Sequence, residues 1–190
     1  KDPAAKVKEA LLAADRALAA SPEESHGHTK KAYAYLFQSN YLQRHGKPAD
    51  ASRVRELRIE EGKLAVAQHP DDAYAYVALG GAYMRMAEAY AEEKKPIAEY
   101  IKKSYECYEA AEKYNSRFPW AYNGHALTSL AEAQYLVDNN ISPLRKIEQA
   151  IELSLKSTNI DNAYIHGYNT ITVATVRAAV WMMEHGIDPA

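Results

Sequence analysis

The sequence predicts an all-α protein, a superhelical stack of antiparallel helix pairs that repeats about every 48 residues. Three observations support this fold class: the spacing of the prolines, the recurrence of one dipeptide, and the spacing of apolar residues within the segments between prolines. Together these features are typical of an α-solenoid, in which each helix pair stacks on the next.

The eight prolines fall where helices would begin or end. Proline is tolerated in the first turn of a helix and is damaging inside one. Pro96 follows Pro48 by 48 residues, and Pro143 follows Pro96 by 47. Pro70 and Pro119 close the segments before them and are 49 residues apart. The prolines therefore indicate helices of about 20 residues in alternating pairs.

A recurring dipeptide gives the same period. Ala73-Tyr74 recurs 48 residues later as Ala121-Tyr122, and again 42 residues further on as Ala163-Tyr164. Self-similarity at a fixed spacing is the sequence mark of a repeat protein. We therefore expect Tyr74, Tyr122 and Tyr164 to occupy one register on three helices.

Within the segments, apolar residues recur at three and four positions, as on one face of a helix. Examples are Val7, Leu11 and Leu18 in the first segment, and Leu144 and Ile151 in a later one. No segment shows the sustained alternation of a strand. Glycines at 46 and 186 stand where a left-handed helix C-cap is expected.

The expected order is a lone second helix followed by helix pairs. We expect first helices over 25–45, 72–93, 120–138 and 162–185, and their partners over 48–68, 96–116 and 143–158, after a helix over 3–20. The chain is then a single array: 1–24 the lone helix, 25–72, 73–120 and 121–162 three repeats, and 163–190 a half repeat. Because both ends cut the period, we expect the chain to belong to a longer protein.

Composition excludes several classes of protein. A net charge of −2 argues against a nucleic-acid binder. No apolar run reaches the roughly 20 residues that span a bilayer, so we expect no membrane insertion and a soluble protein. The sequence leaves its location unknown, whether cytoplasmic or periplasmic. The single cysteine allows no internal disulfide. Fifteen tyrosines, against two Phe and two Trp, are expected at half-buried seams or groove walls.

The stretch Tyr76-x2-Leu79-Gly80-x2-Tyr83 resembles the first-helix signature of the tetratricopeptide repeat, with Tyr in place of the usual Trp. The repeat here is longer than the usual 34 residues. The segments "KDPAAKVKEALLAADRALAASPEE" and "EHGIDPA" further resemble the repeat arrays at the C-terminal end of some bacterial serine/threonine protein kinases. That resemblance implies a sensor or interaction module, and the chain itself contains no kinase catalytic segment.

The resemblance also implies that the first helices line a concave groove. The matching positions, as candidate binding residues, are His26, Thr29, Tyr33 and Phe37; Tyr74, Val77, Gly81, Met84 and Arg85; Tyr122, His125, Ser129 and Glu132; and Tyr164, Gly167 and Ile171. Tyrosine supplies large rigid contact area with one hydrogen-bonding end, which suits peptide recognition. The plainer interpretation, that tyrosines at helical spacing pack the seams, stays open. The Lys and Asn groove residues of the chaperone-binding subclass are missing, which argues against chaperone tails.

Other chemistry finds little support. His26 and His28 point to different sides of a helix, so we expect no metal site. Cys107 is expected to be a buried apolar residue, and no cofactor or enzymatic activity is expected. Arg53, Arg55 and Arg58 alternate with glutamates and suggest surface ion pairs. The leading hypothesis is a protein- or peptide-binding scaffold. The alternatives are a homo-oligomeric module stacking through exposed repeat ends, and a small-molecule sensor.

Overall fold

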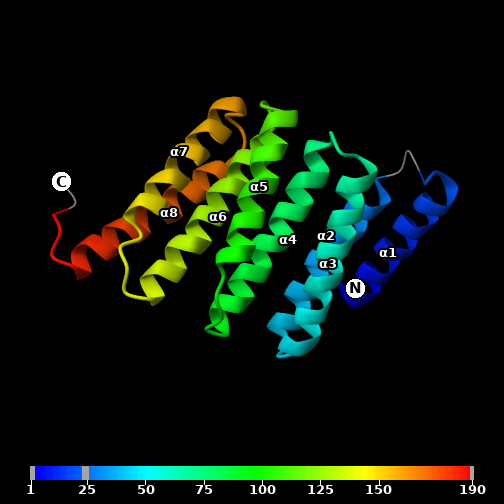
Figure 1. Ribbon diagram of the computed structural model, residues 1–190, viewed down its shortest axis with the longest axis horizontal. Coiled ribbons are helices and arrows are strands. Elements are labelled where there is room, and N and C mark those ends of the chain that lie inside the picture. The colour runs from blue at the N-terminus through cyan, green and yellow to red at the C-terminus, as the bar shows by residue number, and fades with distance from the viewer. Residues whose placement is uncertain (1–2, 23–25, 189–190) are drawn as a thin grey trace.

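The computed structural model describes residues 3–22 and 26–188, which form eight α-helices and no strand. The helices follow one another side by side in chain order (Figure 1): α1 (Pro3–Ala20), α2 (Gly27–Arg44), α3 (Pro48–Gln68), α4 (Ala73–Glu92), α5 (Ala98–Tyr114), α6 (Pro119–Asp138), α7 (Leu144–Ile160) and α8 (Ile165–Glu184). The expected all-α solenoid is therefore confirmed. Pro189 and the expected boundaries at 1, 24–25 and 190 lie outside the described residues.

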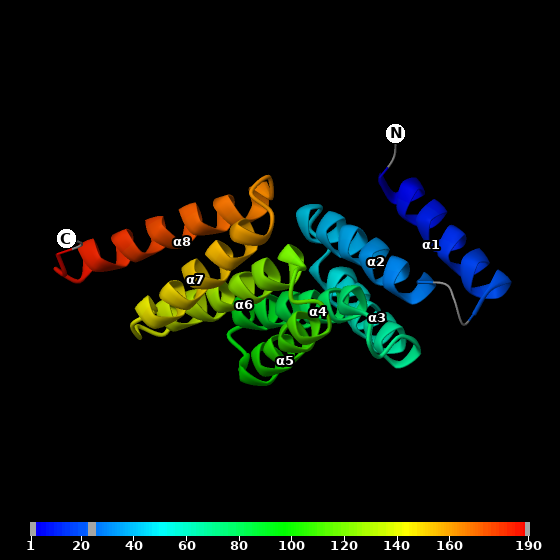
Figure 2. The same ribbon diagram turned by 90° about the horizontal axis from the view of Figure 1, so that it is seen from above.

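The helices form antiparallel pairs, α2 with α3, α4 with α5 and α6 with α7. We call α2, α4, α6 and α8 the A helices and α1, α3, α5 and α7 the B helices. Each A helix contacts the next A helix, whereas among the described helices no B helix contacts the next B helix. The row therefore bends with the A helices inside. Figure 2 shows this arc, with α2 and α8 on its inner side and α3 and α5 on its outer side.

The prolines lie at helix boundaries, as expected. Pro48 and Pro119 open α3 and α6, Pro70 lies in the turn before α4, and Pro143 directly precedes α7. Proline lacks an amide hydrogen, which costs least where the first turn of a helix leaves that amide unpaired. The observed helices begin and end within a few residues of the expected bounds.

The structural period, however, is 46 residues rather than 48. The A helices begin at residues 27, 73, 119 and 165, each 46 after the last. The turns agree, because the Asn115 side chain accepts a hydrogen bond from the amide of Arg117 and the Asp161 side chain, 46 residues on, accepts one from Ala163. The proline spacing gave too long a repeat because the prolines do not occupy equivalent positions. Pro119 is the first residue of α6, whereas Pro70 lies three residues before α4.

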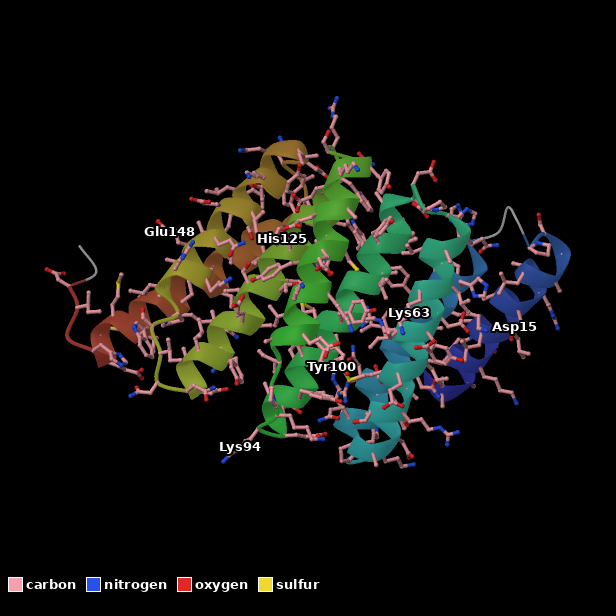
Figure 3. The ribbon with its side chains drawn as sticks, viewed as in Figure 1. Asp15, Lys63, Lys94, Tyr100, His125 and Glu148 are labelled. Carbon is pink, nitrogen blue, oxygen red and sulfur yellow. The ribbon has the colours of Figure 1, made fainter. Side chains whose placement is uncertain are left out.

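All four A helices end in the same backbone motif. The residues after their last turn have positive φ angles: Gly46 (70°), Lys94 (56°), Asn140 (57°) and Gly186 (66°). In each case the next residue donates its amide to a carbonyl five residues earlier, as Lys95 does to Tyr90 at 2.8 Å. This is the Schellman C-cap. The predicted caps at Gly46 and Gly186 are confirmed, and Lys94, which points away from the helices in Figure 3, occupies the same position without glycine.

Small residues allow the helices to approach closely. A Cβ on Gly124 would lie 2.2 Å from a ring carbon of Tyr108, so the α5 ring occupies the space that a side chain on α6 would need. At Gly80 a Cβ would meet Cys107 and Tyr108 at 3.1 Å, so a side chain there would crowd the contact between α4 and α5. Ser104 joins the same seam with hydrogen bonds to the Gly80 carbonyl at 2.9 Å and to Thr128 at 2.8 Å.

None of the described helices is long and apolar enough to cross a membrane.

Candidate functional site: the concave face

The inner side of the arc contains a hollow of about 430 Å³ between α4, α6 and α8. Its lining repeats with the structural period. The residues that line it at equivalent places are Leu127 and Val173; Met84 and Leu130; Arg85, Ala131 and Arg177; Glu88 and Gln134; and Glu92 and Asp138. The A helices therefore present one continuous register to this side. We call this surface the concave face.

The concave face combines apolar residues with one ion pair and other polar groups. Arg85 Nη1 lies 2.7 Å from Glu88 Oε2, with both side chains partly exposed. The guanidinium of Arg177 donates to the Leu130 carbonyl at 3.3 Å. Val173 is 44% exposed. Apolar surface beside a few oriented polar groups is typical of a ligand-binding surface.

Two of the predicted residues on α4 line this hollow, namely Met84 and Arg85. Val77 is 7% exposed and packs in the core with Tyr108. Tyr74 is half-buried, and its ring stacks on Tyr33 at 5.3 Å and lies 6.2 Å from Phe118. Tyr33 and Tyr74 are thus brought together, at the seam between α2 and α4.

The remaining candidates on α2 are divided. His26 is exposed just before the helix, with Nδ1 3.2 Å from a carboxylate oxygen of Asp72 and its ring 4.8 Å from that of His69. Thr29 is fully buried, so it presents no groove surface. Phe37 is 64% exposed.

The candidates on α6 do not lie on the concave face. Tyr122 packs against the core formed with α7, and its hydroxyl donates to the Ser116 carbonyl. His125 is 7% exposed and its Nδ1 lies 2.8 Å from the Glu112 carboxylate; Figure 3 shows it within the array. Ser129 is fully buried.

Glu132 lines a different hollow, of about 440 Å³, between α5 and α6. It accepts a hydrogen bond from the Tyr105 hydroxyl at 2.7 Å and lies 2.8 Å from Lys146 Nζ. The α6 candidates were placed on the wrong face because the predicted period of 48 residues is two residues longer than the structural one. An error of two residues turns a position by about 200° around a helix, which places it on nearly the opposite face.

The expected common register of three tyrosines is therefore wrong. The residues equivalent to Tyr74 are Trp120 and His166, and the equivalents of Tyr122 are Tyr76 and Tyr168. Tyr76 confirms this register because, like Tyr122, it donates to the carbonyl six residues earlier.

Tyr164 stands at the residue before α8, half-buried beside Trp120, and burial raises its pKa to about 12. Gly167 is buried: a Cβ there would lie 2.6 Å from a Thr158 methyl group, so this candidate faces α7. Ile171 is half-buried.

Most of the lining of this hollow, including Leu127, Ala131, Val173 and Arg177, was not predicted from the sequence. The turn residues could have revealed them, since His69, Asn115 and Asp161 follow the A-to-B hairpins at equal intervals of 46 residues and fix the register of the next A helix. The arginine at position 58 was also misjudged: it is 4% exposed and buried, not a surface residue.

Cys107 is the only cysteine of the chain, and it is buried. Burial raises the pKa of the Cys107 thiol to about 12, which keeps it protonated and unreactive at neutral pH. No group of three or more His, Cys, Asp or Glu in the described part of the chain is placed to hold a metal ion. The concave face presents apolar side chains such as Val173 beside charged ones such as Arg85 and Glu88.

No model of a known protein family matches this chain, and no curated protein matches it.

Proposed function

We propose that this protein is a binding scaffold whose concave face holds a peptide or an exposed segment of another protein. The observation that carries the proposal is the hollow of about 430 Å³, which three A helices line at equivalent positions. A surface that repeats along an arc suits an extended ligand, because each repeat can contact the next part of the same chain. The tetratricopeptide-like signature of α4 supports the same function, and a sensor role beside a bacterial kinase domain is a narrower form of it.

Leu127 and Val173 stand at equivalent positions on this face, and neither is fully buried. A glutamate at position 173 would place a charge in the apolar part of the hollow and repel a peptide that packs there. Because Val173 is 44% exposed, the substitution is expected to leave the fold intact.

The test begins with selection of binders from a random peptide library by the wild-type protein. The affinities of enriched peptides are then measured by fluorescence polarisation for three proteins. V173E should weaken binding at least tenfold. L64E makes the same change at a residue of α3 that is 49% exposed and lies outside the hollow, and it should bind like wild type. A library without enriched sequences, or equal losses in V173E and L64E, would contradict the proposal.

A second candidate function is self-assembly, which the outer face of α8 favours. Ile165, Val176 and Met183 are 64%, 56% and 65% exposed and share one side of the helix. No charged residue lies within that stripe, which is also formed by Tyr168, Asn169, Thr172, Ala179 and Val180. An exposed apolar stripe of this kind is typical of a surface that pairs with another.

A further inference from the structure

Arg58 of α3 is a buried cation without a partner. It is 4% exposed, and its Nε and Nη1 atoms have no hydrogen-bond partner. No ion pair among the described residues includes it. Burial lowers the pKa of its guanidinium to about 10, which is still well above neutral pH, so the group remains charged. Since a buried charge is costly unless it is paired, this side chain calls for an explanation.

The other repeats show that the fold itself does not need an arginine here. The equivalent positions, 46 and 92 residues further along, hold Ser104 in α5 and Ala150 in α7. Both are fully buried. The Ser104 hydroxyl forms its hydrogen bonds within the seam, and Ala150 has no polar group in its side chain. A small residue therefore fills this place in a stable array, and the large cation at position 58 is specific to one repeat.

The tip of Arg58 reaches the register of the concave face. Gly81 is equivalent to Leu127 and Val173, whose side chains line the hollow. A Cβ on Gly81 would lie 2.9 Å from Arg58 Nη2 and 3.3 Å from the Tyr108 hydroxyl. At this position α6 and α8 carry an apolar side chain, whereas α4 carries only Gly81. The guanidinium of Arg58 from α3 and the hydroxyl of Tyr108 from α5 lie next to Gly81 instead.

The groups around this point leave one positive charge uncompensated. Arg85 follows Gly81 by one helical turn, but it is paired with Glu88 at 2.7 Å. Tyr33 of α2 is the other nearby group, and its buried hydroxyl has no hydrogen-bond partner. Two arginines and one glutamate sum to a single positive charge beside phenolic donors. A guanidinium and hydroxyls match a carboxylate, which carries one negative charge and accepts several hydrogen bonds.

We propose that Arg58 and Tyr108 bind a carboxylate at the floor of the concave face, beside Gly81. This inference rests on the proposed function, in that the carboxylate belongs to the bound peptide, as an Asp or Glu side chain or as the C-terminus. The site differs in origin from the rest of the concave face, because B-helix side chains supply its donors.

Acetate is the first probe, because it presents a carboxylate without a peptide. Melting temperatures are measured in sodium acetate and in sodium chloride of equal ionic strength. At ten times the dissociation constant, a specific site raises the melting temperature by roughly 4 °C for a chain of this size. Wild type should show this saturable rise. R58M should not, whereas R53M, which removes an exposed arginine of the same helix, should respond like wild type.

A second variant guards against a folding defect in R58M. G81A keeps the arginine but places a methyl group 2.9 Å from its Nη2 atom, and a flexible side-chain end can yield to it. G81A should therefore fold and lose the acetate response. Equal acetate responses in wild type, R58M and G81A would overturn the proposal. So would stronger protection by inorganic phosphate than by acetate, because a doubly charged anion exceeds the single free charge.

The two proposals can fail separately. If selected peptides bind the concave face but wild type and R58M respond equally to acetate, the carboxylate site is refuted and the scaffold function stands. If acetate protects wild type alone and no peptide is selected, the scaffold function is refuted. Where peptides are selected, replacing each carboxylate by its amide identifies the source. One such replacement should weaken binding to wild type at least tenfold and leave binding to R58M unchanged.

Discussion

Single residues in this array carry polar groups into buried or half-buried places. Tyr33, Tyr105 and Tyr108 are the clearest cases, since burial is the first cause that raises the pKa of each phenol. Tyr108 lies against Gly124 with no room for a side chain there, so its ring cannot move out without opening the α5–α6 seam. These residues tie the packing of the seams to the protonation of their hydroxyls.

We therefore expect cooperative unfolding in alkali. A tyrosine whose pKa is raised in the folded state stabilises the fold fully below its unfolded pKa of about 10. Above that pH the unfolded chain ionises and the folded chain does not, so stability falls by about 1.4 kcal/mol per pH unit for each such tyrosine. The ultraviolet absorbance of tyrosinate and the loss of helical circular dichroism should change together as pH rises above about 10.

The control is Y108F, which removes one of the ionisable groups while keeping the ring. Its alkaline transition should move to higher pH. Ionisation of all fifteen tyrosines while the helices persist would show that these hydroxyls are open to water, and would contradict the assignment of buried phenols.

At the scale of elements, the A helices share one way of ending. A positive φ angle destabilises a non-glycine residue by about 1–2 kcal/mol. Replacing that residue by glycine recovers only part of this, because glycine loses more conformational freedom on folding. Lys94 has a φ of 56° at the position where Gly46 and Gly186 stand. The end of α4 is therefore less stable than its backbone motif allows.

K94G is expected to raise the free energy of unfolding by about 0.5–1 kcal/mol, measured by urea denaturation. N140G should gain less, because asparagine tolerates this conformation better than lysine. The reverse change, G186A, should destabilise the protein by a similar amount. A loss of stability in K94G would contradict this prediction, because it would mean that the Lys94 side chain stabilises the fold by more than its backbone conformation costs.

The helices were predictable from the sequence, because proline and apolar spacing report on the local backbone. The register was not, because a proline can stand in the turn, as Pro70 does, or in the first helical position, as Pro119 does. Two residues of difference turned the α6 candidates away from the concave face. The burial of Arg58 was beyond prediction from local pattern, because glutamates stand two residues away on either side and only tertiary packing beside Gly81 encloses it.

At the scale of the whole molecule, the two ends of the array differ. The exposed side of α8 is an uncharged stripe around Val176 and Met183. The exposed surface of α1 carries charges, including Lys8, Glu9 and Arg16, with Leu12 among them at 48% exposure. If the α8 stripe packed against α1 of another copy, the charges of α1 would be buried without partners. Two α8 stripes can instead bury each other around a twofold axis. If the protein self-associates as proposed, pairing through α8 is therefore favoured over end-to-end stacking, because it gives a closed dimer.

This predicts a concentration-dependent dimer that M183E weakens. A glutamate at the end of the apolar stripe places a charge in the contact without a partner, so the dissociation constant should rise at least tenfold. Sedimentation equilibrium of wild type, M183E and L12E measures this, and L12E, the same charge change on α1, should dimerise like wild type. Species that grow beyond the dimer and are lost in both variants would establish end-to-end stacking instead. A wild-type protein that stays monomeric at every concentration would show that the α8 stripe does not drive self-association.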